Sequence, residues 1–321
     1  MTEKSFAVAL NEAIKEEMRA DPSIFVMGES IRGGIYGVTG GLHQEFGDDR
    51  VLDCPLSETG FMGAAVGAAA VGMRPIVGSL CAFMWVAMDQ FVNQVAKMKY
   101  MFGGQATLPL VYRVGISYGN NSAAHHTDRP HPIYMNIPGF KIVMPTTPAD
   151  AKGLFKTAVR DNDPVLFFED NTLMGVRGDV PEKDYTIPYG VADVKRQGDD
   201  VTILAVGGMV TRSLAAAERL EADGISAEVV DPRSLVPLDK KTILDSVAKT
   251  GRFVAVDSAH KTCSFASEAC ALVAQEGFWS LQAPVQRVAS HMVHPPFSPA
   301  LEPMLYPDED RIIEAVKKTF E

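Results

Sequence analysis

Cysteine is scarce in this sequence, and so are tryptophan and long apolar runs. The 321 residues include 4 cysteines and 2 tryptophans. The cysteines form no C-x-x-C pair and have no metal-ligand spacing, which favours reduced, packed thiols over a disulfide framework or a zinc site. No run of about 18 residues is free of charged or polar breaks, so the sequence predicts no membrane span. The N-terminal segment lacks the apolar core of a secretory signal, and we expect a cytoplasmic location.

Positive charge is also in deficit. The chain carries 30 lysines and arginines against 40 aspartates and glutamates, for a net charge of −10. This balance argues against a nucleic-acid partner. The apolar share of 46% and the charged share of 22% are ordinary for a globular protein with a sizeable core. The length allows two α/β domains of about 100–200 residues each, and we expect an enzyme or an enzyme subunit.

Several motifs that mark common enzyme classes are absent. The sequence has no Walker motif, no H-E-x-x-H and no G-x-G-x-x-G after a predicted strand. The glycines of residues 33–41 could cradle a phosphate. Gly60 and Gly63 open a predicted helix, where close packing explains them better than a dinucleotide does. A nicotinamide-binding site is therefore not favoured.

Hydrophobic periodicity alternates between strand and helix along the whole chain. The predicted strands are 24–27, 51–56, 75–80, 108–114, 141–144, 165–169, 201–206, 227–230, 253–256 and 285–288, and the predicted helices are 5–20, 84–101, 148–161, 209–223, 239–250, 264–276 and 308–320. Such alternation predicts two parallel-sheet α/β domains with helices on both faces. Glycine, proline and charge dominate residues 175–190. We therefore expect domains at 1–177 and 191–321, joined by a linker at 178–190.

The functional prediction depends most on the stretch from Asp53 to Gly72. Glu58 stands where a strand-like run meets a helix of alanine, glycine and valine, which suits close burial. Glu58 has two interpretations. It is either a first-turn acid that stabilises the helix through the helix dipole, or a buried acid that holds a proton for a ligand nitrogen, because burial raises a carboxyl pKa.

Histidines and aromatic residues give further candidates. His125, His126 and His131 lie in the irregular stretch 115–138, where long loops are often functional. They suit a surface loop, a metal site without the usual zinc spacing, or a proton carrier or anion clamp at a cleft. Phe83 follows a strand end, and it is either a core residue or a side chain that stacks on a flat ring.

Blocks spread over almost the whole chain resemble one known family. In order they are GES, GVTGGL, RVLDCPLSETGFMGAAVGAA, MDQFVNQVAKMKYMFGG, AAHHT, PGFKIVMPTTPADAKGLFKTAVRDNDPV, DVTILAVGGMV and VVDPRSLVPLD. They resemble the β subunit of thiamin-diphosphate-dependent dehydrogenases, the first components of the pyruvate, branched-chain 2-oxo acid and acetoin dehydrogenase complexes. KYMFGG and AVRDNDPV are most similar to the acetoin branch. The resemblance implies a transketolase-like pyrimidine-binding domain followed by a transketolase C-terminal domain.

The resemblance also implies roles for individual residues. Glu58 matches the acid that hydrogen-bonds nitrogen N1′ of the cofactor's aminopyrimidine, and Phe83 matches the aromatic that packs on that ring. His126 matches a histidine that serves proton transfer or the lipoyl step, and Glu29 matches a buried acid that links two active sites. The resemblance further implies a loop that binds a monovalent cation such as K⁺, mainly through main-chain carbonyls. The residues of this loop are Leu110, Ala158, Val159, Asp161 and Asp163. A plain turn at a helix end is the alternative for that set.

Half of the family's cofactor site is missing here. The family holds the diphosphate through Mg²⁺ on a GDG motif, and this chain has no GDG. The resemblance therefore implies an α subunit that carries the GDG motif and Mg²⁺. It further implies an assembly of two α and two β chains with a homodimeric β core. The implied reaction cleaves the substrate beside its carbonyl and passes the acyl group to a lipoyl acyltransferase.

Four departures from the family pattern leave the substrate open. They are Ser30 and Gly78, where acids are common, Thr127 and Asp128, where serine and glutamine are common, and Asp257 with Ser258, where aspartate and glutamate are common. Two other functions stay possible from the sequence. One is half of a split transketolase, and the other is a non-catalytic α/β interaction subunit.

Overall fold

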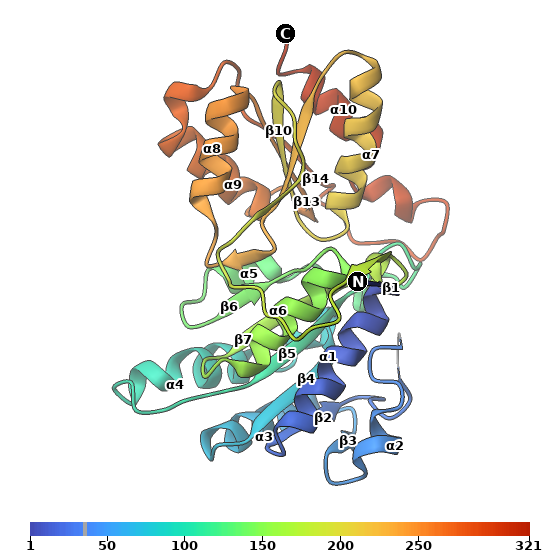
Figure 1. Cartoon of the computed structure of the whole chain (residues 1–321), viewed down its shortest axis with the longest axis vertical. Coiled ribbons are helices and arrows are strands. Elements are labelled where there is room, and N and C mark those ends of the chain that lie inside the picture. Colours follow the sequence, from blue (N-terminus) through green and yellow to red (C-terminus); the bar gives the residue numbers. More distant parts are fainter. Residues whose placement is uncertain (35–36) are drawn as a thin grey trace. The chain divides into compact units, whose positions relative to one another are not determined.

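The computed structural model describes residues 1–34 and 37–321, which form two compact units (Figure 1). The first unit comprises 1–118, 126–128 and 133–188, and the second comprises 119–125, 129–132 and 189–321. Residues 35–36, inside the predicted glycine loop 33–41, lie outside the described residues. Each unit is described by itself below.

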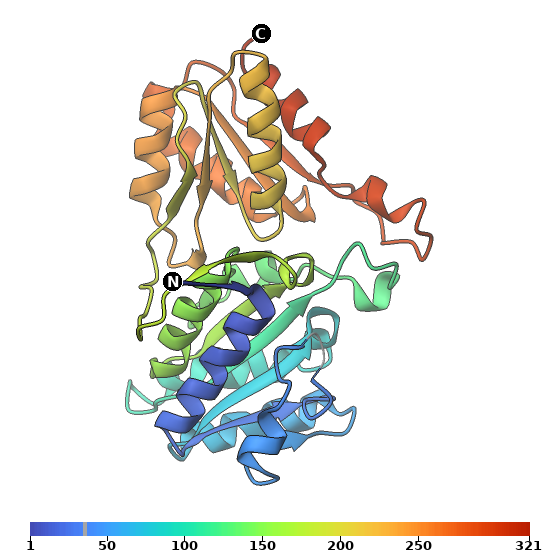
Figure 2. The same ribbon diagram turned by 45° about the vertical axis from the view of Figure 1, so that its right-hand side comes forward.

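Six parallel strands form the sheet of the first unit, in the order β6-β7-β5-β4-β2-β3. They are β2 (Ile24–Gly28), β3 (Val51–Asp53), β4 (Arg74–Leu80), β5 (Val111–Ile116), β6 (Lys141–Val143) and β7 (Val165–Asp170). The helices of this part of the chain are α1 (Phe6–Ala20), α2 (Leu42–Phe46), α3 (Glu58–Ala70), α4 (Ala96–Met101), α5 (His131–Met135) and α6 (Pro148–Arg160). Helices α1 and α6 lie side by side (Figures 1 and 2) and are joined by the Arg160–Glu17 ion pair.

Local sequence explains the first helix well. The Ser5 side chain accepts a hydrogen bond from the Val8 amide and caps α1. Phe6, Leu10 and Ile14 fall on one stripe, and all three are fully buried. The predicted stripe is thereby confirmed.

The second unit has a five-stranded sheet in the order β14-β13-β10-β11-β9. Strands β10 (Val201–Ala205), β11 (Ala227–Asp231), β13 (Phe253–His260) and β14 (Gln286–Ser290) are parallel, and β9 (Asp193–Arg196) pairs antiparallel with β11. A short strand β12 (Ser234–Val236) follows β11 in the chain. Helices α7 (Met209–Ala222), α8 (Lys240–Thr250), α9 (Phe265–Glu276) and α10 (Glu309–Lys317) flank the sheet on both sides.

The structure differs from the sequence prediction at several elements. The helix predicted at 84–101 is three pieces: a 3₁₀ turn η2 (Cys81–Trp85), a π-helical turn η3 (Gln90–Val95) and α4. The Asp89 carboxylate accepts hydrogen bonds from Asn93 and Gln94, four and five residues later, and this spacing suits the wider π turn. Strand β9 was not predicted at all.

Part of the predicted linker forms a strand. β8 (Arg177–Val180) pairs antiparallel with β1 (Thr2–Ser5) at the N-terminus. The pairing joins segments that are far apart in sequence, and glycine and charge at 177–179 hide it from a local pattern.

Among the described residues, the four cysteines are thiols and not disulfides. Cys263 is exposed rather than packed, which corrects the expectation for that thiol. Among the described residues, no helix is long and apolar enough to cross a membrane.

Candidate functional site

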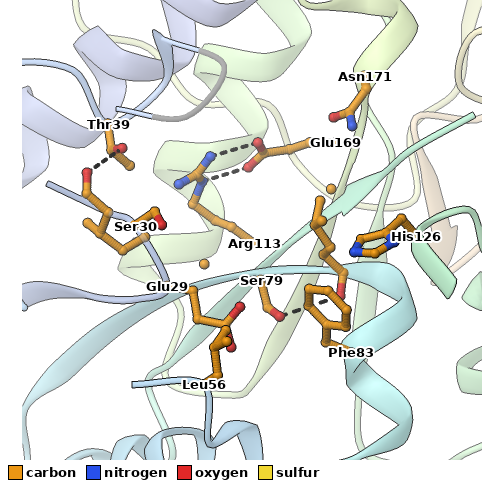
Figure 3. Close-up of a pocket in the computed structure, with 14 residues that line it drawn as sticks. Glu29, Ser30, Thr39, Leu56, Ser79, Phe83, Arg113, His126, Glu169 and Asn171 are labelled. Carbon is orange, nitrogen blue, oxygen red and sulfur yellow. Dashed lines mark hydrogen bonds and ion pairs between the residues drawn. The ribbon is translucent and has the colours of Figure 1, made fainter. Parts of the chain in front are cut away.

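A cavity of about 240 Å³ opens at the carboxyl ends of the strands of the first unit (Figure 3). We call it the Glu29 cavity. The register places Leu80, Gly115 and Glu169 in one row across β4, β5 and β7, and all three line the cavity. Carboxyl ends of parallel strands are where α/β folds bind ligands.

Two carboxyl groups face each other beside this cavity. Glu29, directly after β2, is half-buried and lines the cavity. Its side chain forms a hydrogen bond with the side chain of Glu58, at the start of α3. Burial, together with the negative charge and hydrogen bond of Glu58, raises the pKa of Glu29 to about 7. Its Oε1 is buried without a hydrogen-bond partner. The pair can therefore hold one proton near neutral pH and still accept a ligand donor.

The predicted deep burial of Glu58 is wrong for this chain. Glu58 is half-exposed and does not line the cavity itself. Helix α3 buries one face through Phe61, Met62 and Ala65, whereas Gly60 on another face is exposed. Deep burial of this acid would need a second polypeptide over the exposed face of α3.

Two rings meet at another wall of the Glu29 cavity. The rings of Phe83, in η2, and His126 lie edge to face, with centroids 5.5 Å apart and planes at 81° (Figure 3). Asp128 holds the histidine segment in place, because its carboxylate accepts from Trp85 Nε1 at 2.8 Å and its carbonyl accepts from Cys81 Sγ. The departure at Asp128 thus has a positioning role that the sequence did not reveal.

A buried ion pair closes the cavity on the sheet side. Arg113 on β5 binds Glu169 on β7 through two hydrogen bonds of 2.6 and 2.7 Å, and the two side chains are 8% and 4% exposed. Sequence reasoning missed both residues. The available signal was one charged residue within each of two apolar strand patterns.

Two glycines lie close together beside this pair. A Cβ on Gly28, where φ is +147°, would lie 2.2 Å from the Gly78 carbonyl oxygen. A Cβ on Gly78 would lie 2.9 Å from Ile31 Cδ1 and 3.7 Å from Arg113 Nη1. Position 78 therefore places no carboxylate beside the Arg113 guanidinium, which among the described residues pairs with Glu169.

Asn171 adds unused hydrogen-bonding capacity to the lining. Both polar atoms of its side chain are buried without a partner. Sequence reasoning missed it, because a single asparagine after a strand is typical of turns.

His126 and His131 make different contacts. Whereas His126 packs on Phe83, His131 Nε2 lies 3.1 Å from Asp257 Oδ1, and both of those side chains are fully buried. Burial alone would raise the pKa of Asp257, but His131 and two backbone amides hold that pKa below its ordinary value. The described residues contain no group of three or more histidine, cysteine or acidic side chains that could hold a metal ion.

The predicted monovalent-cation loop is well hydrogen-bonded. Arg74 Nη1 donates to the carbonyls of Val159 and Asp161 at 3.0 and 2.8 Å. The Leu110 and Ala158 carbonyls accept from backbone amides. Lys141 binds the carboxylates of Asp161 and Asp163. A carbonyl oxygen has two lone pairs, so each keeps capacity for a cation, and the site stays a prediction.

Comparisons with known proteins cover nearly the entire chain. Family models of the transketolase pyrimidine-binding domain and the transketolase C-terminal domain match residues 2–176 and 190–312. The acetoin:2,6-dichlorophenolindophenol oxidoreductase subunit beta of Bacillus subtilis is 46% identical, over 96% of this chain and 95% of that protein. The pyruvate dehydrogenase E1 component subunit beta of the same species is 42% identical over the full length of both. A split-gene transketolase, described as an inactive β4 tetramer, shares the fold with a TM-score of 0.81 at 24% identity, covering 98% of this chain and 97% of that one.

Proposed function

Because the chain belongs to the family of β subunits of thiamin-diphosphate-dependent acetoin and 2-oxo acid dehydrogenases, we propose that it supplies the pyrimidine-binding half of a thiamin-diphosphate site. In this proposal an α subunit brings the GDG motif and Mg²⁺, and two α and two β chains assemble around a β dimer in the cytoplasm. The proposed domains are 1–177 and 191–321, with a linker at 178–190. K⁺ in the loop of Leu110 and Asp161 is part of the same proposal.

The acid pair is the observation that carries this function. A ring nitrogen that must gain and lose a proton needs a carboxyl group with a pKa near the working pH. Glu29 has a pKa raised to about 7 through burial and Glu58, and its buried Oε1 has no partner. The residues present therefore fit the aminopyrimidine of the cofactor. Thiamin diphosphate, when bound, supplies the nucleophilic carbon that attacks the substrate carbonyl.

In this proposal, residues of this chain hold a proton, contact the pyrimidine ring and move a proton at the mouth of the site. Glu58 holds a proton at N1′ of the pyrimidine, and Glu29 shares that proton through its hydrogen bond to Glu58. Phe83 offers an aromatic face to the pyrimidine ring, and His126, in edge contact with it, moves a proton at the mouth. The mouth is also where a lipoyl acyltransferase would receive the acyl group.

Charge in the Glu29 cavity favours acetoin over a 2-oxo acid. The Arg113 guanidinium is paired with Glu169, so His126 is the one other basic side chain among the described lining residues, and Asn171 offers a neutral donor. The pair of Glu29 and Glu58 would repel a substrate carboxylate, whereas acetoin is uncharged. The identity of 46% to the acetoin relative, against 42% to the pyruvate relative, points the same way.

Reconstitution with an α subunit tests the proposal. Turnover of acetoin, pyruvate and a branched 2-oxo acid is measured for the wild type, for Glu58→Gln and for the exposed-site control Glu218→Gln. We expect acetoin to be the best substrate. Loss of the acid should lower kcat by about 10²–10⁴-fold, with no change in the control.

Two outcomes would contradict the proposal. Unchanged turnover in Glu58→Gln would remove the acid from the mechanism and favour a non-catalytic interaction subunit. Transfer of two-carbon ketol units between sugar phosphates, without activity on acetoin or 2-oxo acids, would favour half of a split transketolase.

A further inference from the structure

A second cavity, of about 660 Å³, lies within the second unit. It opens at the carboxyl ends of the neighbouring parallel strands β13 and β14, whose register pairs His260 with Ser290. Basic side chains gather here, and we call it the Arg287 cavity: Lys261, Arg287, His291 and Arg311 line it together with Ser267 and Cys263. No aspartate or glutamate is among the lining residues that the structure describes.

Arg287 and Arg311 donate hydrogen bonds to uncharged groups. Arg287 Nη1 donates to Ser267 Oγ at 2.7 Å and to the Lys261 carbonyl at 3.3 Å. Arg311 donates to the carbonyls of Ala289 and Leu305. In the described part of the chain, Lys261, Arg287 and Arg311 form no ion pair, although Asp308 and Glu314 act on Arg311 from its own helix.

This arrangement reverses the charge balance of the whole chain. The protein has 40 acidic and 30 basic residues, so ion-pair partners are plentiful elsewhere. Arg287 uses one nitrogen for its bonds to protein, and a guanidinium has five N–H donors. The remaining donors of Arg287 and the Lys261 ammonium are therefore available to a ligand.

We propose that the Arg287 cavity binds a phosphate-bearing small molecule. Guanidinium and ammonium groups together match the multiple charges and the oxygen geometry of phosphate. A concave site of this volume suits a small ligand better than a flat acidic protein surface. The proposal is independent of the function assigned to the Glu29 cavity, because it rests on residues of the second unit alone.

Cys263 provides a local reporter. It is exposed and lines the cavity, whereas Cys81 and Cys270 are buried and Cys54 is half-buried. The full chain, alone and with its α partner, is alkylated by iodoacetamide, and the rate at each cysteine peptide is followed by mass spectrometry. Pyrophosphate, ADP and inorganic phosphate are the probes, at constant ionic strength.

We expect pyrophosphate or ADP to slow alkylation of Cys263 at least fivefold at saturation and to leave the rate at Cys54 unchanged. In the double variant Lys261→Gln with Arg287→Gln, the midpoint of this protection should rise at least tenfold. The matched control is Lys241→Gln with Arg219→Gln, which removes the same number of positive charges on α8 and α7. Its midpoint for protection of Cys263 should equal that of the wild type.

Three results would overturn the proposal. One is no protection of Cys263 by any probe up to about 10 mM. Another is equal protection in the double variant and the wild type, which would place the anion elsewhere. The third is protection by an acidic peptide at lower concentration than by ADP, which would identify the cavity as a protein-docking surface.

Discussion

The coupling between Glu29 and Glu58 predicts a specific pH dependence of stability. The pKa of Glu29 is raised from 4.5 to about 7 in the folded chain. At about 1.36 kcal/mol per pKa unit, this difference corresponds to at most about 3 kcal/mol. Partial exposure screens the charges, so we expect about 1–2 kcal/mol in practice.

The sign follows from proton binding. Between pH 4.5 and about 7, the folded chain keeps the Glu29 proton that the unfolded chain has released. The Glu29 contribution to the free energy of unfolding therefore falls as pH rises through this window and is lowest above it. Glu58→Gln removes the like-charge repulsion but leaves the desolvation of Glu29, which is the largest cause of its raised pKa. The variant should therefore gain only part of this free energy, about 0.5–1 kcal/mol, relative to the wild type as pH rises from 5 to 8.

Urea unfolding at pH 5 and pH 8 measures this gain. Trp85 belongs to the first unit and Trp279 to the second, so a Trp279→Phe background makes tryptophan fluorescence report on the first unit alone. Trp279 is 95% exposed, and its replacement should cost little. Glu218→Gln serves as the control. Parallel pH profiles for Glu58→Gln and wild type would refute the coupling.

Two further predictions concern buried carboxylates and their partners. Arg113 and Glu169 belong to the first unit, so the same urea assay tests them, whereas Asp257 belongs to the second unit, so urea unfolding of its variant is followed by circular dichroism of the whole chain. Arg113→Gln should lower the free energy of unfolding by about 3–5 kcal/mol, because Glu169 is left buried without its partner, and the double change Arg113→Met with Glu169→Leu should restore most of the loss; a loss below about 1 kcal/mol would contradict this. The pKa of Asp257 is lowered from its ordinary value of 3.8, so its carboxylate stabilises the fold at pH values above 3.8. This contribution is lost as pH falls through the lowered pKa. Asp257→Asn should therefore destabilise the chain more at pH 7 than at pH 3, and a pH-independent difference would argue against a stabilising Asp257 carboxylate.

Local patterns in the sequence predicted most helices and strands. The stripe of Phe6, Leu10 and Ile14 specifies α1 wherever its partners lie, since helix periodicity is a property of one segment. Fold class followed from the alternation of such segments. The π turn at Gln90–Val95 did not follow, because its polar side chains bond at an unusual spacing that an apolar period does not encode.

The site was predictable only in part. Glu29, Phe83 and His126 were predicted from the resemblance, and the structure brings them to one cavity. Arg113 and Glu169 were missed, because their pairing depends on the register between β5 and β7, and these two strands are far apart in sequence. Gly78 was noted as a departure, but its position beside Arg113 becomes visible only in three dimensions.

Cofactor affinity tests the central claim most directly. Thiamin diphosphate with Mg²⁺ is titrated by calorimetry into this chain alone and into its complex with the α subunit. The account predicts at least 100-fold tighter binding to the complex, because this chain grips only the pyrimidine end. Equal, tight binding to the chain alone would contradict it.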